Sequence, residues 1–491
     1  MTISQKSTKY ANASTILLFF IALSSLLTIS VIRNYNNNDI LPGESSYNIA
    51  RLAKDIQSRN NLIFYDRLSY NGRILSLQQG TPLTVALFSK LFSLPVDMSL
   101  RIIPIILGMI SLIAFYLIVR KLLENKRSAQ LSILFLLLSP PFLYTFSTSN
   151  TRMLPITITL LGISFLLYKK TIPAAIAFAF IPLFGTLHSM IALALFFIHV
   201  VVRKQNKALF FLILAFNLIL IGLLNIPVIK AYGFPSMLDF KIKELGLNFT
   251  FQNFIAEFGG IFGLSIFSIM LALSGFAAMW KKKFHYLTIY IALFLFILLS
   301  TYLIWPIIHL NFLISILAAI GLINLRTIKW ESRLIKNFTI IILLSGLVVT
   351  FFIHINSISN LPPNQDIIDS LEALNAESNP EDVVLSHYSN GFWIESVASR
   401  PALMDSNFVY APGVNEKYID TQKIFSSRSI DEVAPLLEKY GIKYIWITND
   451  MKSGETWKNE EDGLLFLLKY NTRFKKLFSN QNAELWWYIG E

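Results

Sequence analysis

The feature that most constrains this fold is a series of long apolar segments separated by short basic loops. A helix needs about 20 apolar residues to cross a bilayer. Eleven segments meet or approach this length: residues 13–32, 100–119, 129–146, 153–168, 171–186, 188–202, 208–228, 260–280, 284–304, 307–325 and 337–356. The sequence therefore predicts a multi-pass α-helical membrane protein with about eleven transmembrane helices.

The charges are strongly segregated along the 491 residues. Residues 1–356 hold 30 Lys+Arg and 10 Asp+Glu, whereas residues 357–491 hold 12 and 20. Basic residues at membrane edges explain this excess better than nucleic acid does, so we expect membrane lipid and no nucleic acid as a partner. The chain has no cysteine, which excludes disulfides and thiolate chemistry.

Basic residues gather in alternate loops. These are Arg120, Lys121, Lys126 and Arg127, then Lys169 and Lys170, then Arg203, Lys204 and Lys207, then Lys281–Lys283, and finally Arg326, Lys329, Arg333 and Lys336. Because Lys and Arg resist translocation, this pattern predicts a cell-membrane protein with a cytoplasmic N-terminus. The long loops 33–99 and 229–259 and the C-terminal region are then extracytoplasmic.

The composition changes at residue 357. We expect a transmembrane domain over 1–356 and a soluble extracytoplasmic α/β domain over 357–491. "QDIIDSLEALN" and "SIDEVAPLLEKY" have the periodicity of amphipathic helices, while "DVVLS", "KYIWIT" and "AELWWYIG" are typical of short strands.

An amphipathic stretch, "LPGESSYNIARLAKDI", follows the first span. Ile49, Leu52 and Ile56 recur at helical spacing. This pattern predicts a helix that lies in the membrane interface, with these residues in lipid and Arg51 and Lys54 facing headgroups. An exposed loop helix is the alternative.

Three acids lie where the chain leaves or enters the membrane on the outer side. A group transfer at this surface needs a carboxylate that accepts a proton and cations that hold a departing phosphate. Glu44 is our candidate for the carboxylate, with Asp39 in reserve and Glu257 on the acceptor side. Other outer-loop acids, such as Asp66, are expected to face solvent, and a solvated charge is also the alternative for each candidate.

Cations for a phosphate are available at the same level. Arg101 and Arg152 end two spans on the outer side, and His309 lies at the outer rim. A guanidinium pairs well with a phosphate. The alternative is that these arginines snorkel to the interface and that the histidine is an ordinary interfacial residue.

Two parts of the sequence resemble the GT-C superfamily of polyprenyl-phosphate-sugar-dependent glycosyltransferases, which includes protein mannosyltransferases. "GESSYNIARLAKDI" is similar to the acidic motif of their first outer loop. The segment that follows it, which contains "RIIP" and ends with "VRKLL", is similar to the next segment of the family. Together these cover about the first 125 residues. "VVLSHYSNGFWIESVASRPALMDSNF" resembles the W-W-D-Y-G region of oligosaccharyltransferases. The resemblance implies acceptor-binding roles for His387, Tyr388 and Asn390, and an acceptor contact for Glu257.

The sequence departs from this pattern at three places. "HYSNG" replaces W-W-D-Y-G, "STSNTRMLP" replaces the D-x-D loop, and Gly43 replaces the first acid of the pair that ends at Glu44. In the family the first-loop acid and the D-x-D motif hold a divalent metal such as Mg²⁺ or Mn²⁺. No D-x-D motif supports that metal here, so we assign no metal ligands and no cofactor.

The leading hypothesis is a GT-C-type glycosyltransferase of the hexosyltransferase class. It would move a sugar from a polyprenyl-phosphate-linked donor to a protein, glycan or lipid acceptor on the extracytoplasmic face. The alternatives are an oligosaccharyltransferase for protein N-glycosylation, and a non-catalytic or transport protein on the same scaffold.

Overall fold

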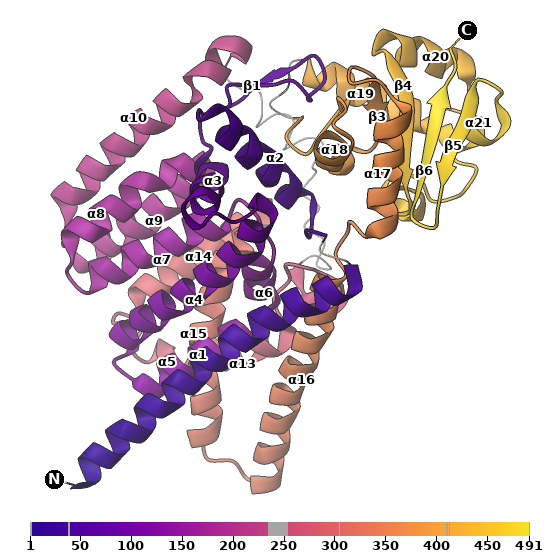
Figure 1. Ribbon diagram of the computed structural model, residues 1–491. Helices are drawn as coiled ribbons and strands as arrows, with labels where there is room; N and C mark the ends of the chain where they lie inside the picture. Colours follow the sequence, from indigo (N-terminus) through magenta and orange to yellow (C-terminus); the bar gives the residue numbers. More distant parts are fainter. Residues whose placement is uncertain are drawn as a thin grey trace. The chain divides into compact units, whose positions relative to one another are not determined.

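The computed structural model describes residues 2–37, 40–233, 254–303, 305–408, 411 and 413–490 (Figure 1). The chain forms two compact units. Unit 1 contains residues 1–36, 100–223 and 247–360, and unit 2 contains residues 37–99, 224–246 and 361–491. Most of the first predicted outer loop therefore folds together with the C-terminal region. The predicted domain boundary at residue 357 stays a prediction.

Unit 1 is helical throughout its described elements. These are α1 (Thr2–Asn37), most of α4 (Val96–Leu123), α5 (Lys126–Leu137), α6 (Pro140–Ser147), α7 (Met153–Leu167), α8 (Thr171–Phe180), η1 (Ile181–Phe184), α9 (Thr186–Arg203), most of α10 (Lys207–Tyr232), η2 (Ala256–Phe258), α13 (Ile266–Trp280), α14 (Leu287–Tyr302), α15 (Ile307–Thr327) and α16 (Arg333–Ser359).

Six helices within the described residues are long and apolar enough to cross a membrane, namely α4, α9, α10, α15, α16 and residues 14–35 of α1. The pair α5 and α6, bent by 68°, is a seventh candidate, and α7, α8 with η1, α13 and α14 are shorter apolar helices. Each predicted segment overlaps one of these helices or the bent pair. The count of eleven crossings stays a prediction.

Large apolar side chains are exposed on several of these helices. Leu212 on α10, Phe294 on α14 and Ile341 on α16 are 66%, 70% and 62% exposed. An apolar surface of this extent is stable when lipid covers it. The chain is an integral membrane protein.

Two glycines bring α13 and α15 into close contact. A Cβ on Gly275 would lie 1.9 Å from the carbonyl oxygen of Leu317, and a Cβ on Gly321 would lie 1.9 Å from that of Leu271. Membrane helices pack this closely only where small residues let the backbones approach. The core around this contact includes Leu271, Ala318 and Leu322.

Gly321→Ala is therefore expected to destabilise unit 1 by about 1–3 kcal/mol, because the added methyl group forces the two backbones apart. Thermal unfolding of the detergent-solubilised protein measures the effect. Gly222→Ala in α10 is the matched control, since nothing lies within 4 Å of a Cβ placed there. Equal melting temperatures for the two variants would contradict the prediction.

Unit 2 combines helices with two sheets. Its first part holds α2 (Glu44–Arg59), β1 (Tyr65–Asp66), β2 (Arg73–Ile74) and α3 (Gly80–Phe92); its second part holds α17 (Gln365–Glu377), β3 (Val383–Leu385), η3 (Tyr388–Asn390), α18 (Gly391–Trp393), η4 (Ile394–Ala398), α19 (Val414–Ser426), α20 (Ile430–Lys439), β4 (Ile442–Thr448), η6 (Met451–Glu455), α21 (Leu464–Tyr470), β5 (Phe474–Ser479) and β6 (Ala483–Tyr488).

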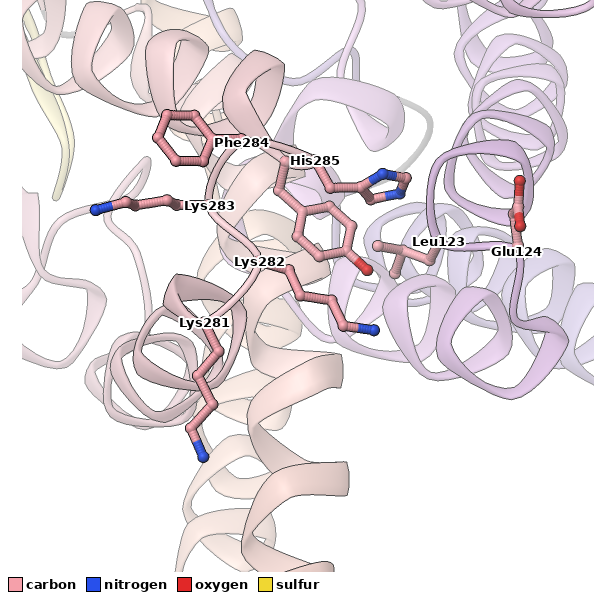
Figure 2. A pocket seen from close by; sticks show the side chains of 8 residues that line it. Leu123, Glu124, Lys281, Lys282, Lys283, Phe284 and His285 are labelled. Carbon is pink, nitrogen blue, oxygen red and sulfur yellow. The ribbon is translucent and has the colours of Figure 1, made fainter.

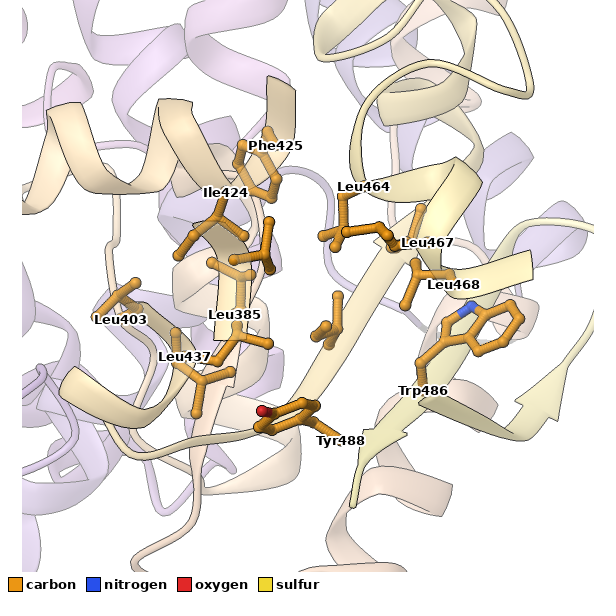
Figure 3. Close-up of a cluster of buried hydrophobic side chains, with 14 of the residues drawn as sticks. Leu385, Leu403, Ile424, Phe425, Leu437, Leu464, Leu467, Leu468, Trp486 and Tyr488 are labelled. Atoms are coloured by element: carbon orange, nitrogen blue, oxygen red, sulfur yellow. The ribbon is translucent and has the colours of Figure 1, made fainter. Parts of the chain in front are cut away.

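The larger sheet has the strand order β3-β4-β6-β5 and is covered on both faces. The β3–β4 pair is parallel and the other pairs are antiparallel. Along β4, Ile445 and Ile447 pack in the core under α19, α20 and α21, while Tyr444 and Trp446 pack in a second core with α17. Figure 3 shows the first core, with Ile424 of α19, Leu437 of α20 and Leu464 of α21 labelled. Successive strand residues point to opposite faces, which explains the near-continuous apolar run of this strand.

The predicted local elements of this region agree with the structure. "QDIIDSLEALN" lies in α17, "SIDEVAPLLEKY" overlaps α20, and the three predicted strands overlap β3, β4 and β6.

The predicted environment of the helix after Glu44 was wrong. Ile49, Leu52 and Ile56 of α2 are 1%, 8% and 6% exposed, so they are covered by protein and not by lipid. The partners of α2 are α3, α18 and η4. An apolar stripe has the same spacing whichever apolar medium covers it.

Candidate functional site

Glu44 is the first residue of α2. The residue before it, Gly43, has φ +72° and donates its N–H to the carbonyl of Pro362 at 2.8 Å. Residues other than glycine are disfavoured at this φ, because their Cβ atom clashes with the backbone. The helix therefore begins with a carboxylate at its N-terminus, where the unpaired N–H groups favour negative charge.

The carboxylate of Glu44 contacts a hydroxyl from the C-terminal part of unit 2. Ser406 Oγ donates to Glu44 Oε1 at 2.6 Å and lies 2.7 Å from Oε2. The two residues are 362 positions apart in the sequence. Ser406 was not among the predicted site residues, because nothing in its local sequence indicates this partner.

Three aromatic rings lie beside this contact. The rings of Tyr388 and Phe408 are 5.0 Å apart, and those of Phe408 and Tyr418 are 5.9 Å apart and nearly parallel. Burial raises the pKa of Tyr388, and the nearby Tyr418, Glu455 and Glu44 raise it further. Tyr388 is thus close enough to interact with the Glu44 carboxylate and stays a protonated hydroxyl at neutral pH.

The other two predicted acceptor-binding residues of the "HYSNG" segment, His387 and Asn390, make contacts within unit 2. His387 Nδ1 lies 3.0 Å from Glu455 Oε1, which also accepts a hydrogen bond from Ser389 at 2.7 Å. Asn390 is buried and donates to Ser386 Oγ at 3.0 Å. Their acceptor-binding roles stay predictions.

A buried network of charges connects the first part of unit 2 to the second. Arg51 on α2 makes a bidentate pair with Asp66 at 2.7 and 2.8 Å and also contacts Glu395 at 2.8 Å. Arg73 on β2 contacts Asp405 at 2.9 Å and Asp66 at 3.5 Å. The expectations that Asp66 faces solvent and that Arg51 faces lipid headgroups were wrong, because each charge is neutralised inside the protein.

Burial and neighbouring charges shift the pKa values of Asp66 and Glu395 in opposite directions. Burial opposes ionisation of Asp66, but the hydrogen bond from Arg51 and the charges of Arg51 and Arg73 hold its pKa below the usual value. Burial raises the pKa of Glu395 well above its usual value, and the charge of Asp405 raises it further. Glu395 Oε1 and the Nε atoms of both arginines have no hydrogen-bond partner among the described residues.

Glu395→Gln is expected to reduce the pH dependence of stability. Because the folded pKa of Glu395 is raised, its contribution to stability is complete below the unfolded value of about 4.3 and is lost as the pH rises through the folded value. Glutamine is neutral at every pH. Thermal unfolding at pH 5 and pH 8 should show a smaller difference in the variant than in the parent; an unchanged difference would contradict the raised pKa.

Lys417 of α19 is a further buried cation beside this network. Its Nζ lies 4.8 Å from the ring centroid of Tyr70. Burial, with a smaller effect from the charge of Arg73, lowers the pKa of Lys417 to about 8. A buried amine with this pKa changes its charge near physiological pH.

The predicted donor-phosphate residues all lie in unit 1. The guanidinium of Arg152, which precedes α7, lies 3.0 Å from the ring centroid of Trp305. Arg101 lies on α4, and His309 is buried in α15 with its ring stacked on Phe296 at 5.3 Å.

A second histidine lies near Arg152 and His309. His188, at the start of α9, interacts electrostatically with both. The Nδ1 atoms of His188 and His309 are buried and have no partner among the described residues. The predicted phosphate-binding roles of Arg101, Arg152 and His309 stay predictions.

Glu257 caps a helix. Its carboxylate accepts hydrogen bonds from Ser265 Oγ at 2.6 Å, from the N–H of Ile266 at 2.9 Å and from Thr350 Oγ1 at 2.9 Å. These contacts fix the beginning of α13 against α16. A groove of about 490 Å³ beside it is lined mostly by residues of α16, both apolar and polar. The predicted acceptor contact of Glu257 is not tested by this arrangement.

A second hollow lies at the other end of α13. It has a volume of about 510 Å³ and is lined by Leu123, Glu124 and residues 281–286; Figure 2 shows the side chain of Lys282 and the ring of His285 on its wall. Leu123, Glu124 and Lys281–Lys283 lie in loops that the charge pattern predicts to be cytoplasmic, and residues 284–286 begin the next predicted apolar segment. This hollow therefore contains none of the predicted site residues.

Asp39 lies outside the described residues. Among the residues that are described, no group of three or more His, Asp or Glu side chains is arranged to hold a metal ion.

The comparisons with known proteins agree with this architecture. A family model described as dolichyl-phosphate-mannose-protein mannosyltransferase matches residues 80–181, which run from the start of α3 to the first residue of η1. No curated protein matches the chain significantly by sequence.

Several solved structures share the fold. The Archaeoglobus fulgidus oligosaccharyltransferase in the apo form aligns with a TM-score of 0.64 and 14% identity, over 93% of this chain and 72% of that one. ArnT from Cupriavidus metallidurans bound to undecaprenyl phosphate aligns with a TM-score of 0.59 and 12% identity, over 96% of this chain and 97% of that one.

A third match is the arabinofuranosyltransferase AftD from Mycobacteria, with a TM-score of 0.55 and 12% identity, over 96% of this chain and 40% of that one. The fold is therefore that of the GT-C membrane glycosyltransferases, as the resemblance in the sequence predicted. The chain is similar to each of these proteins across most of its length.

Proposed function

We propose that this protein transfers a sugar from a polyprenyl-phosphate-linked donor to a protein, glycan or lipid acceptor, as a hexosyltransferase. The observation that carries the proposal is the Glu44 carboxylate, which begins α2 and is held by Ser406 on a GT-C fold. Of the proteins with this fold, ArnT binds undecaprenyl phosphate and the Archaeoglobus enzyme AglB binds a peptide and a dolichol-phosphate.

In the proposed reaction, the acceptor hydroxyl attacks the anomeric carbon of the donor sugar. The new carbon–oxygen bond forms as the bond to the phosphate oxygen breaks, and the bonding electrons leave with the phosphate. Glu44 accepts the proton of the acceptor hydroxyl. Arg101, Arg152 and His309 stabilise the phosphate that leaves, and Tyr388 and His387 contact the acceptor.

The proposed topology has eleven transmembrane helices in the cell membrane and a cytoplasmic N-terminus. Residues 357–491 then form an extracytoplasmic α/β domain. The alternating distribution of Lys and Arg supports this orientation.

Purified full-length protein tests the function directly. The donor is the mixture of polyprenyl-phosphate-linked sugars extracted from host membranes, and the acceptor is the host membrane fraction. Release of free polyprenyl phosphate, with a matching gain of sugar in the acceptor fraction, is the expected result. A donor that stays intact would refute the proposal. Strict dependence on a divalent metal and an Asn-x-Ser/Thr peptide would instead indicate an oligosaccharyltransferase.

A further inference from the structure

The contact between Glu44 and Ser406 differs from the contacts of the neighbouring acids. Asp66 and Asp405 each face an arginine guanidinium at 2.7–2.9 Å. Glu44 instead accepts a hydrogen bond from the hydroxyl of Ser406, whose oxygen lies 2.6 and 2.7 Å from the two carboxylate oxygens. A hydroxyl orients a carboxylate but adds no positive charge beside it, so it weakens the basicity of the carboxylate less than a guanidinium does.

The backbone that carries Ser406 is held on several sides. Arg73 binds the Asp405 carboxylate, which also accepts the N–H of Asn407 at 2.6 Å. The N–H of Phe408 donates to the carbonyl of Asp405 at 2.8 Å and closes a tight turn. These contacts fix the position of the backbone from which the Ser406 side chain extends.

A glycine allows this turn to lie where it does. A Cβ on Gly391, the last residue of "HYSNG", would lie 2.5 Å from the Cα of Asp405. The close approach joins the segment that resembles W-W-D-Y-G to the turn that carries Ser406.

The backbone that carries Glu44 is also held. Ser46 Oγ contacts the carbonyls of Pro42 and Gly43, each at 2.7 Å, and the N–H of Gly43 donates to Pro362. Both partners of the hydrogen bond therefore start from constrained backbone positions. A group placed in this way needs little reorganisation before it reacts.

We propose that Ser406 is a positioning residue for Glu44: its hydroxyl holds the carboxylate in the orientation, and in the ionised form, that accepting a proton requires. The inference rests on the proposed function in one respect, namely that the proton comes from the acceptor hydroxyl. The positioning itself is a property of the protein without substrate, and it is measured separately.

Two kinds of substitution separate positioning from packing. Ser406→Ala removes the hydroxyl, and Ser406→Cys keeps its approximate shape with a much weaker donor. Ser406→Thr keeps the hydroxyl. The matched control is Ser427→Ala, which removes another serine–glutamate hydrogen bond of unit 2, to Glu432 at 2.7 Å.

The first measurement uses the full-length protein in detergent without substrate. The pH at which Glu44 becomes reactive toward a water-soluble carbodiimide is followed by mass spectrometry of its peptide. Loss of a hydrogen bond to the ionised form is expected to move the midpoint about one pH unit higher in the Ala and Cys variants. The Thr variant and the Ser427→Ala control should keep the parent midpoint.

The second measurement is release of polyprenyl phosphate from the extracted donors. The Ala and Cys variants should lose about ten-fold or more in rate, and the Thr variant should recover most of it. If both the Ala and Cys variants had the same pH midpoint for Glu44 as the parent protein, the positioning role would be overturned. If the parent protein released no polyprenyl phosphate while the midpoint still moved, the proposed function would fail and the Ser406 contact would stand.

Discussion

Glu44→Gln is expected to lower the rate of sugar transfer by about 10²–10⁴-fold, the usual effect of removing a general base. The amide has nearly the same shape as the carboxylate and still accepts the hydroxyl of Ser406. It does not accept a proton from an acceptor at neutral pH. The donor extract and membrane acceptor described above provide the assay, with free polyprenyl phosphate as the product.

A second acid at a helix N-terminus provides the control for this variant. Glu416 lies in the first turn of α19 and pairs with Lys439 at 2.6 Å on the surface. Glu416→Gln removes one negative charge from unit 2 and should leave the rate unchanged. Equal rates in the parent and in Glu44→Gln, with both proteins folded, would remove Glu44 from the mechanism.

Arg51→Met is expected to destabilise unit 2 by about 3–5 kcal/mol. The substitution removes the guanidinium that Asp66 and Glu395 share and leaves the Asp66 carboxylate only its longer contact with Arg73, at 3.5 Å; removing one partner of a buried ion pair has a cost of this size. Methionine fills much of the volume of the arginine stem. The loss of stability therefore comes from the missing charge and not from a cavity. The effect should appear as faster amide hydrogen exchange in α2 and around β1 and β2.

Lys54 provides the matched control on the same helix. It pairs with Asp97 at 3.1 Å, and the two side chains are 56% and 47% exposed. Lys54→Met should change stability by less than about 1 kcal/mol, because exposed ion pairs contribute little. If Arg51→Met exchanged no faster than Lys54→Met, the buried network would not be a main source of stability in unit 2.

The local sequence was sufficient to predict the apolar helices of unit 1 and several elements of unit 2. Apolar runs of about 20 residues predicted the helices of unit 1, since a helix in lipid needs an apolar surface along its whole length. Periods of 3.6 and 2 predicted α17, α20, β3, β4 and β6, because these periods depend on backbone geometry alone.

Partner choice was not predictable in the same way. The sequence indicated an amphipathic helix in the stretch that follows Glu44 and an apolar stripe along it, but not the medium that covers the stripe. Arg51 and Asp66 had the sequence context of exposed charges, and the structure pairs them inside the protein. The apolar pattern is identical for a helix against lipid and a helix against α3 and α18, so periodicity does not distinguish the two.

The sequence by itself therefore determined which segments are apolar helices, three of the strands, and that an amphipathic helix follows Glu44. Only the tertiary structure decided that Ser406 meets this carboxylate across 362 positions and that two arginines and three acids share one buried network. The physical reason is range: helix and strand geometry repeats over a few neighbouring residues, whereas a hydrogen bond between distant segments forms only after both have packed.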